Sequence, residues 1–277
     1  MAQQARRAGN MSDDAIAKFK EGQRQGWKHF APLEMMTTPV AARLVKFADV
    51  HAGHALLDVG CGTGVVAITA ARNGARVCGL DLTPELLDRA RENSRIANVK
   101  LDLREGDVEA LPFDDGAFDV VLSQFGHMFA PRPDVALAEM LRVLKPGGRI
   151  AFATWPPELL IGSTFTLVGK YMPPPPPGVS PSPQWGDVGV VRERLGTRVK
   201  DVIFDRACML VPALSVQNYR DYLERAAGPM LRVVESLGAS DPAGLARFRA
   251  EYDVLVSPYF EDNLVRQDYL FTRATKV

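Results

Sequence analysis

Cysteine and an excess of charge of one sign are the features that this sequence most clearly lacks. Its three cysteines, Cys61, Cys78 and Cys208, are too few and too irregularly spaced for a zinc site or a disulfide framework. The 33 basic and 33 acidic side chains cancel, so the chain has no net field that would attract nucleic acid or anionic lipid. We therefore expect a reduced compartment and no nucleic-acid partner.

Long apolar runs are also absent. No stretch reaches the roughly 18 to 20 apolar residues that a membrane span needs, and the opening residues MAQQARRAGNMSDD lack the apolar core of a signal peptide. We expect a cytoplasmic protein with no membrane span. Its 277 residues, 47% hydrophobic and 24% charged, are typical of a soluble globular protein with one large core.

Short apolar runs alternate with helical stretches between residues 55 and 155. This alternation predicts an α/β fold, a doubly wound and mostly parallel sheet covered by helices. The glycines and prolines that follow each helical stretch mark its end. The expected strands are ALLDV (55–59), RVCGLD (76–81), KLDLREGD (100–107), FDVVLS (118–123) and RIAFATW (149–155), and the expected helices cover 65–73, 84–97 and 134–145.

A different pattern follows residue 155. We predict a helix over 158–172, a stiff surface loop at the five prolines 173–177, a helix over 187–196 and a strand over 198–207. An interaction motif is the weaker interpretation of the prolines. Gly228 and Pro229 divide the helical pattern of 215–261, and 264–277 forms a closing strand. We expect a helical segment (1–50) over the cofactor site, a core (51–214), a helical cap (215–262) and a final core strand (263–277).

The most informative motif is LLDVGCGTG, at the junction of the first strand and first helix. Glycine lets a backbone turn sharply and approach a ligand closely, so Gly60, Gly62 and Gly64 predict a ligand site at the carboxyl edge of the sheet. A dinucleotide fingerprint would need glycine where Val65 stands. A nicotinamide dehydrogenase is therefore the weaker alternative.

Two further acids follow neighbouring strands. Asp81 ends the second expected strand, where a carboxylate can accept both hydroxyls of a ribose. Asp107 follows the third strand and is placed to accept from an adenine amino group, with Leu82 and Val108 as apolar faces for the ring. Carboxyl ends of parallel strands share one sheet edge, so these acids and Asp58 predict a nucleoside-binding site.

The motifs LLDVGCGTG, GLDLTPELLDRAR, GDVEALPFDDGAFDVVLS and LRVLKPGGRIAF, in this order, resemble those of class I S-adenosylmethionine-dependent methyltransferases. The resemblance is to the small-molecule group that includes the ubiquinone- and menaquinone-biosynthesis type. It implies S-adenosyl-L-methionine as cofactor and a seven-stranded, Rossmann-like sheet whose last strand is antiparallel. It also implies that Gly60, Cys61 and Gly62 lie against the methionine part, and that Asp58 organises this loop and the amino group.

The resemblance places Ser123 and Gln124 close to the sulfonium, and Trp27 or Phe30 over the cofactor. Many relatives carry paired histidines after the fourth strand, whereas this chain has SQFGHMF with a single His127. Imidazole titrates near neutrality, so His127 is the candidate general base; a buried supporting role is the alternative. In-line transfer from a sulfonium depends chiefly on alignment, so a base is not obligatory.

Apolar and aromatic residues downstream predict an acceptor pocket under the cap. We predict a methyltransferase that acts on a lipophilic or aromatic small molecule at O, C or N, as a monomer or homodimer and without metal. A cofactor-binding regulator or scaffold that keeps this fold without turnover is the alternative from another class. The expected pocket residues are Met128, Phe129, Phe165, Tyr219, Tyr222 and Met230.

Overall fold

A mostly parallel β-sheet forms the centre of the protein in this computed structural model, which describes residues 13–277. The main strands follow the order β3-β2-β1-β4-β5-β8-β6, and β8 is antiparallel to both β5 and β6. The predicted seven-stranded, doubly wound fold is confirmed; a two-residue strand, β7, also pairs with β8. The strands are β1 (Ala55–Val59), β2 (Arg76–Asp81), β3 (Asp102–Glu105), β4 (Phe118–Gln124), β5 (Leu144–Thr154), β6 (Val199–Pro212), β7 (Phe260–Glu261) and β8 (Leu264–Lys276).

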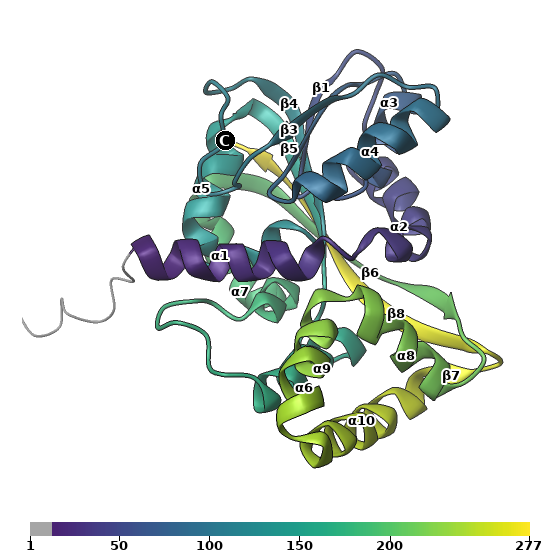
Figure 1. Cartoon of the computed structure of the whole chain (residues 1–277). Helices are drawn as coiled ribbons and strands as arrows, with labels where there is room; N and C mark the ends of the chain where they lie inside the picture. Colours follow the sequence, from purple (N-terminus) through teal and green to yellow (C-terminus); the bar gives the residue numbers. More distant parts are fainter. Residues whose placement is uncertain (1–12) are drawn as a thin grey trace, which may run out of the picture.

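Helices cover both faces of the sheet. Figure 1 shows α2, α3 and α4 on one side of the strands and α5 and α7 on the other. Within the expected N-terminal segment, residues 13–27 and 34–47 form α1 and α2, and residues 1–12 lie outside the described part of the chain. Among residues 13–277 no helix is long and apolar enough to cross a membrane. The helices are α1 (Asp13–Trp27), α2 (Glu34–Phe47), α3 (Val65–Arg72), α4 (Pro84–Ile96), α5 (Pro133–Arg142), α6 (Leu160–Tyr171), α7 (Val188–Leu195), α8 (Val216–Ala226), α9 (Gly228–Ser240) and α10 (Pro242–Val256).

The junction of α5 and β5 differs from its prediction. The helix ends at Arg142, and the strand already begins at Leu144 and includes the Pro-Gly-Gly sequence. Leu144 pairs with Phe118, whereas Arg149 pairs with Val120. The Pro-Gly-Gly residues are therefore the extra residues of a bulge, and the left-handed conformation of Gly147, with φ 74°, fits that irregular backbone.

The cap consists of α8, α9 and α10 together with α6. Its three consecutive helices break where the sequence predicted, at Gly228 and Pro229, and the Asp241 carboxylate caps α10 by accepting from the Gly244 backbone N–H at 2.8 Å. The expected cap did not include α6, which packs against α9 and α10. The 173–177 proline segment forms neither helix nor strand.

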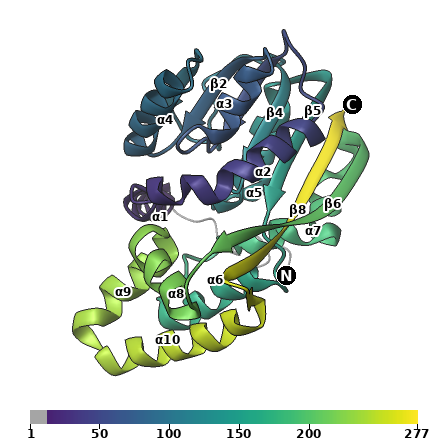
Figure 2. The same cartoon turned by 90° about the vertical axis from the view of Figure 1, so that its right-hand side faces the viewer.

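Strands β6 and β8 connect the sheet to the cap. β5 pairs with β8 only from Leu270 to Thr275, but β6 and β8 remain paired as far as Pro212 and Leu264. This two-stranded ribbon runs past the end of β5 toward the cap (Figure 2). The chain thus has a second wall, beyond the carboxyl ends of β1, β2 and β4, that can enclose a ligand.

Candidate functional site

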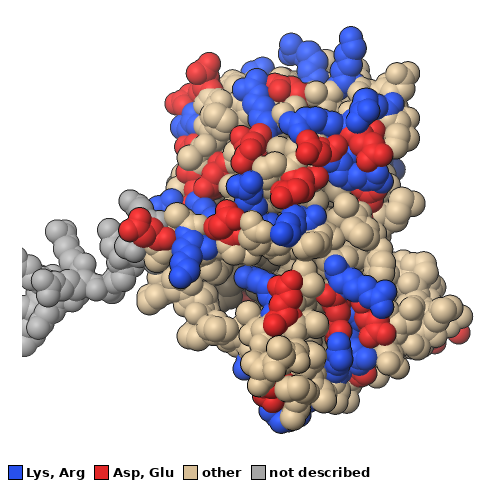
Figure 3. Space-filling view, viewed as in Figure 1, with Lys and Arg blue, Asp and Glu red and all other residues tan. Residues whose placement is uncertain are grey.

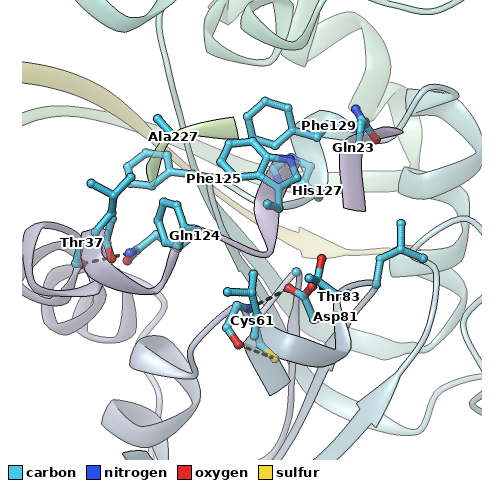
Figure 4. Close-up of a pocket in the computed structure, with 18 of the residues that line it drawn as sticks. Gln23, Thr37, Cys61, Asp81, Thr83, Gln124, Phe125, His127, Phe129 and Ala227 are labelled. Carbon is cyan, nitrogen blue, oxygen red and sulfur yellow. Dashed lines mark hydrogen bonds between the residues drawn. The ribbon is translucent and has the colours of Figure 1, made fainter. Parts of the chain in front are cut away.

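A cavity of about 250 Å³ lies at the carboxyl edge of the sheet. Its walls come from the loops after β1, β2, β3 and β4, from α1, and from the cap and the β6–β8 ribbon. Figure 3 shows a hollow in the surface between the sheet and the cap, with basic and acidic side chains interspersed over the face in view. Figure 4 shows side chains that line the cavity, among them Cys61, Asp81, Gln124 and Phe129.

The glycine-rich loop that follows β1 forms part of the cavity wall. Gly60, Gly62 and Gly64 all have positive φ angles, of 64°, 52° and 83°. A Cβ at Gly60 would lie 2.9 Å from the Cα of Gly126, whereas a Cβ at Gly62 would meet nothing within 4 Å. Gly60 therefore permits two loops to touch, and Gly62 leaves open space on the cavity side, as a ligand that approaches the backbone requires.

Asp58 has a carboxylate oxygen without a partner. The residue is 1% exposed, and its Oδ2 accepts from the Ala67 backbone N–H at 3.0 Å. Its buried Oδ1 accepts from no described residue. Burial, with a smaller contribution from the charge of Asp81, raises the pKa of Asp58 to about 8. A cationic hydrogen-bond donor in the cavity would satisfy this carboxylate and lower its pKa.

Asp81 holds the glycine loop as well as facing the cavity. Its Oδ2 accepts from the Gly62 N–H at 2.8 Å and its Oδ1 from the Thr83 N–H at 2.9 Å. Burial raises the pKa of Asp81, and these backbone donors oppose the rise. The Cys61 N–H donates to the Leu80 carbonyl at 3.0 Å, so β2 fixes the loop at two points.

Asp107 lines the cavity, but α1 already occupies one of its oxygens. Lys20 Nζ lies 2.5 Å from Asp107 Oδ2 and 2.6 Å from Oε2 of Glu109. The Asp107 Oδ1 accepts from the Glu109 backbone N–H at 2.9 Å. A carboxylate can accept further bonds, so the expected contact with an adenine amino group is possible only if Asp107 binds Lys20 and the adenine at the same time. Nothing near Asp107 in the sequence indicated this distant lysine.

Helix α1 covers the cavity with aromatic and amide side chains. Trp27 lines it and packs against Phe129, with ring centroids 4.7 Å apart, and against Phe30 at 5.8 Å. The Gln23 Nε2 donates to the Phe129 carbonyl at 2.9 Å. Helix α1 therefore forms one wall of the cavity and is joined to the loop that follows β4. Leu82 and Val108 also line the cavity, as expected.

The two residues at the end of β4 differ in position. Ser123 is fully buried outside the cavity lining: its Oγ donates to the Val59 carbonyl at 2.7 Å and accepts from the His127 N–H at 3.0 Å. Gln124 lines the cavity and donates from Nε2 to the Thr37 carbonyl at 3.0 Å, which leaves its buried Oε1 without a partner among the described residues. Ser123 supports the loop, whereas Gln124 can contact a ligand.

The surroundings of His127 do not suit a general base. The residue is 1% exposed, and neither ring nitrogen has a hydrogen-bond partner among the described residues. Its ring centroid lies 4.6 Å from those of both Phe152 and Trp185. Burial, and then the charge of Arg194, lower the pKa of His127 to about 3. Such an imidazole is a weak base, so the alternative of a buried supporting residue fits the geometry better.

Four of the six expected pocket residues line the cavity, and two do not. Phe129, Phe165, Tyr219 and Met230 are in its wall. Met128 is 1% exposed and packs in the core instead. Tyr222 is 39% exposed, and its hydroxyl donates to the Pro32 carbonyl outside the lining. On α8 the residues that face the cavity are Tyr219 and Leu223, four apart, and Tyr222 points away from them.

Several lining residues were missed because they belong to distant elements. Thr37 comes from α2, Met209 from β6 and Gln267 from β8. Gln267 is 2% exposed and its Nε2 donates to the Tyr219 hydroxyl at 2.6 Å. The sequence predicted the strand that carries Gln267 but gave no signal that this part of it extends beyond the sheet to the cap.

Charge divides the cavity into two ends. We define the acidic end by Asp58, Asp81 and Asp107, which lie with Lys20 and Arg24 of α1. Apart from His127, whose low pKa keeps it uncharged, the remaining described residues of the lining have no ionisable acid or base among Asp, Glu, Lys, Arg and His. The neutral end is defined by Phe165, Met209, Tyr219, Met230 and Gln267.

Known proteins resemble this chain along its length. A family model described as "Methyltransferase domain" matches residues 57–152. An uncharacterised protein of Mycobacterium tuberculosis is 35% identical over 91% of this chain and 93% of its own. Demethylmenaquinone methyltransferase of Deinococcus radiodurans is 32% identical over 54% of this chain and 58% of its own. The crystal structure of the YcgJ protein from Bacillus subtilis shares the fold, with a TM-score of 0.57, 18% identity and coverage of 85% and 97%.

Proposed function

The chain belongs to the class I S-adenosylmethionine-dependent methyltransferases, and from this premise we propose that it methylates an uncharged lipophilic or aromatic small molecule. The enzyme class and the cofactor follow from the family. The acceptor and the residues that bind each ligand are the proposal. It assigns the cofactor to the acidic end of the cavity and the acceptor to the neutral end.

The acidic end fits S-adenosylmethionine in its donor and acceptor groups. Asp58 Oδ1 is a buried acceptor without a partner, which suits the ammonium group of the methionine part. Asp81 would hold the ribose hydroxyls. Asp107, with Lys20 at its other oxygen, would accept from the adenine amino group. The open side of Gly62 would accommodate the chain between them.

The observation that carries the acceptor class is the absence of charged side chains at the neutral end, within the described residues. A carboxylate or phosphate buried there would lose its hydration and gain no cation, which costs several kcal/mol. An uncharged aromatic or lipophilic molecule would gain roughly 25 cal/mol per Å² of apolar surface buried against Phe165, Met209 and Met230. The name of the Deinococcus relative, a demethylmenaquinone methyltransferase, agrees with such an acceptor.

The chain contributes to transfer chiefly by alignment. When bound, S-adenosylmethionine supplies the electrophilic methyl group. The acceptor atom, O, C or N, forms the new bond to that carbon in line with the departing sulfur. His127 is too weak a base to take the acceptor proton at neutral pH, so we infer that the proton passes to solvent. Gln124, whose Oε1 has no partner, would orient the acceptor beside the glycine loop.

The cap would close over the acceptor. Tyr219, Leu223 and Met230 lie in the cavity wall and are at most 6% exposed, so the apolar stripes of α8 and α9 are already used within the chain. This favours the interpretation of the cap as a lid over its interpretation as a dimer surface, for which those stripes would have to be exposed. A lid at this position would exclude water during alignment.

Methyl transfer from labelled cofactor tests the proposal. The full chain is incubated with methyl-labelled S-adenosylmethionine and a panel of phenols, quinones and neutral amines, beside carboxylates and phosphate monoesters of similar size. We expect label in the uncharged members alone. Transfer only to the charged members would overturn the proposed acceptor class. Cofactor binding without transfer to any member would favour the regulator or scaffold of the same fold.

A further inference from the structure

Two polar side chains meet in the apolar wall of the neutral end. Tyr219 of α8 and Gln267 of β8 are 1% and 2% exposed and both line the cavity. Gln267 Nε2 donates to the Tyr219 hydroxyl oxygen at 2.6 Å. This bond leaves the Tyr219 hydroxyl proton without a hydrogen-bond acceptor, and the Gln267 Oε1 without a donor, among the described residues.

The pair therefore presents one donor and one acceptor side by side. Burial raises the pKa of Tyr219 well above its ordinary value, so the hydroxyl keeps its proton. The Tyr252 hydroxyl interacts with the Tyr219 oxygen as a donor and so does not take the Tyr219 proton. Nearby wall residues such as Met209, Leu223 and Met230 are apolar and cannot satisfy either group. Because buried polar groups in folded proteins nearly always have partners, the unused donor and acceptor point to a ligand.

We propose that Tyr219 and Gln267 together recognise one uncharged hydroxyl group of the methyl acceptor. The hydroxyl oxygen accepts from Tyr219, and the hydroxyl proton is donated to Gln267 Oε1. A carbonyl satisfies only the Tyr219 donor. A carboxylate offers no proton to Gln267, and an ammonium offers no lone pair to Tyr219. This inference rests on the proposed function and narrows its acceptor to hydroxylated lipophilic or aromatic molecules.

The recognised hydroxyl is an anchor rather than the methylated atom. In the sheet order, β4 and β5 lie between β1, which carries the glycine loop, and β8, which carries Gln267. Three strand spacings of about 4.8 Å put the backbone of the strand that carries Gln267 roughly 14 Å across the sheet from that loop. A reacting atom must lie about 3 to 3.5 Å from the methyl carbon. Tyr219 and Gln267 are therefore positioning residues that set which acceptors fit.

A purely structural bond between the cap and the ribbon is the competing explanation. Tyr269 provides a control, because it is a buried tyrosine on the same strand as Gln267, 1% exposed, and does not line the cavity. Tyr219→Phe removes the unused donor, and Tyr269→Phe removes a buried hydroxyl that has no hydrogen-bond partner among the described residues. Gln267→Met removes the unused acceptor while it keeps the length of the side chain.

Equilibrium dialysis with two probes of nearly equal shape, 2-naphthol and 2-methylnaphthalene, tests the pair on full chains saturated with S-adenosylhomocysteine. We expect wild type and Tyr269→Phe to bind 2-naphthol about tenfold more tightly than 2-methylnaphthalene, as two hydrogen bonds would give. In Tyr219→Phe and Gln267→Met the preference should fall to about threefold or less. The affinity for 2-methylnaphthalene should not change.

Three outcomes would overturn the inference. They are an absence of preference in wild type, an unchanged preference in Tyr219→Phe, and failure of both probes to bind the wild-type complex. Binding of S-adenosylhomocysteine and methyl transfer to the panel are measured on the same preparations. If both are present while the hydroxyl preference is absent, only this inference fails; if both are absent, the proposed function fails with it.

Discussion

The acidic end of the cavity comes from one stretch of chain, residues 58–107, whereas the neutral end is gathered from α6, β6, α8, α9 and β8. At the acidic end, carboxylates hold backbone N–H groups, as Asp58 holds Ala67 and Asp81 holds Gly62 and Thr83. At the neutral end, side chains meet side chains, as in the bond between Gln267 and Tyr219.

This difference explains why one end has a motif and the other does not. A loop held through backbone groups requires glycines and acids at fixed spacings, whichever substrate the protein accepts. A wall of packed side chains requires only apolar surface and a few polar groups, which different elements can supply. In the proposed assignment, the cofactor and the acceptor therefore bind to different kinds of structure.

The largest effect should come from disrupting the contact between the two loops that meet at Gly60 and Gly126, at the acidic end. Gly60→Ala forces a left-handed Ala, at about 1 to 2 kcal/mol, and overpacks the Cα of Gly126, at about 1 to 3 kcal/mol. We expect a loss of about 2 to 5 kcal/mol in the free energy of unfolding in urea. Gly147→Ala is the matched control, because Gly147 also has positive φ but open space at its Cβ. Equal losses in the two variants would mean that the loop contact is unimportant.

The next largest effect should come from Asp81→Ala, which should weaken cofactor binding where a change at the neutral end does not. The change removes charge-assisted hydrogen bonds of about 1.5 to 3 kcal/mol each, both to the glycine loop and, as proposed, to the ribose. We expect calorimetry to show that S-adenosylhomocysteine binds more than tenfold more weakly, while circular dichroism shows a folded chain. Retained affinity would remove Asp81 from the cofactor site. Leu223→Ala, at the opposite wall, should leave this affinity within about twofold.

Asp58 makes cofactor binding depend on pH. The folded-state pKa of Asp58, about 8, lies above the unfolded value of about 3.9, so folding favours the protonated carboxyl. The contribution of this proton to the free energy of unfolding is fully present below about pH 4 and is lost as the pH rises through 8. A bound ammonium group favours the carboxylate, and binding at pH 7 should release a proton. We expect affinity for S-adenosylhomocysteine to rise up to about tenfold from pH 6 to 7. In Asp58→Asn this rise should disappear; a persistent rise would assign the titration to another group.

The smallest effect should arise at the neutral end from Met230→Leu, a change that nearly preserves volume and costs less than about 1.5 kcal/mol. We expect a change of about threefold in KM for the best acceptor of the panel, and no change in cofactor affinity. Tyr222→Phe, on the same cap but outside the lining, is the control and should not alter KM. A larger effect of Tyr222→Phe would show that acceptors bind on the outer side of α8.

The fold and the acidic end could be predicted because their determinants are local. Each glycine or acid lies in its own strand or within a few residues of its end, and parallel strands bring these ends to one edge. Lys20 could not be predicted as a partner of Asp107, because 87 residues separate them. The same holds for Gln267, whose position depends on how far the ribbon of β6 and β8 extends beyond β5.

Two predicted residues have surroundings that do not suit the roles expected of them, although each lies in the expected element. Tyr222 belongs to the expected helix, but only the neighbours at the spacing of Tyr219 and Leu223 face the cavity. His127 lines the cavity, but its ring packs against Phe152 and Trp185 and neither ring nitrogen has a hydrogen-bond partner among the described residues. Sequence periodicity indicates which residues are apolar together, and it does not say which of two neighbouring apolar surfaces is a ligand site.

The division of the cavity into a cofactor end and an acceptor end is the central claim, and a crystal structure of the full chain with S-adenosylhomocysteine tests it most directly. We expect the amino group beside Asp58, the ribose beside Asp81 and the adenine between Leu82 and Val108, with the neutral end left free for the acceptor. A nucleoside bound instead against Tyr219, Gln267 and Met230 would contradict it.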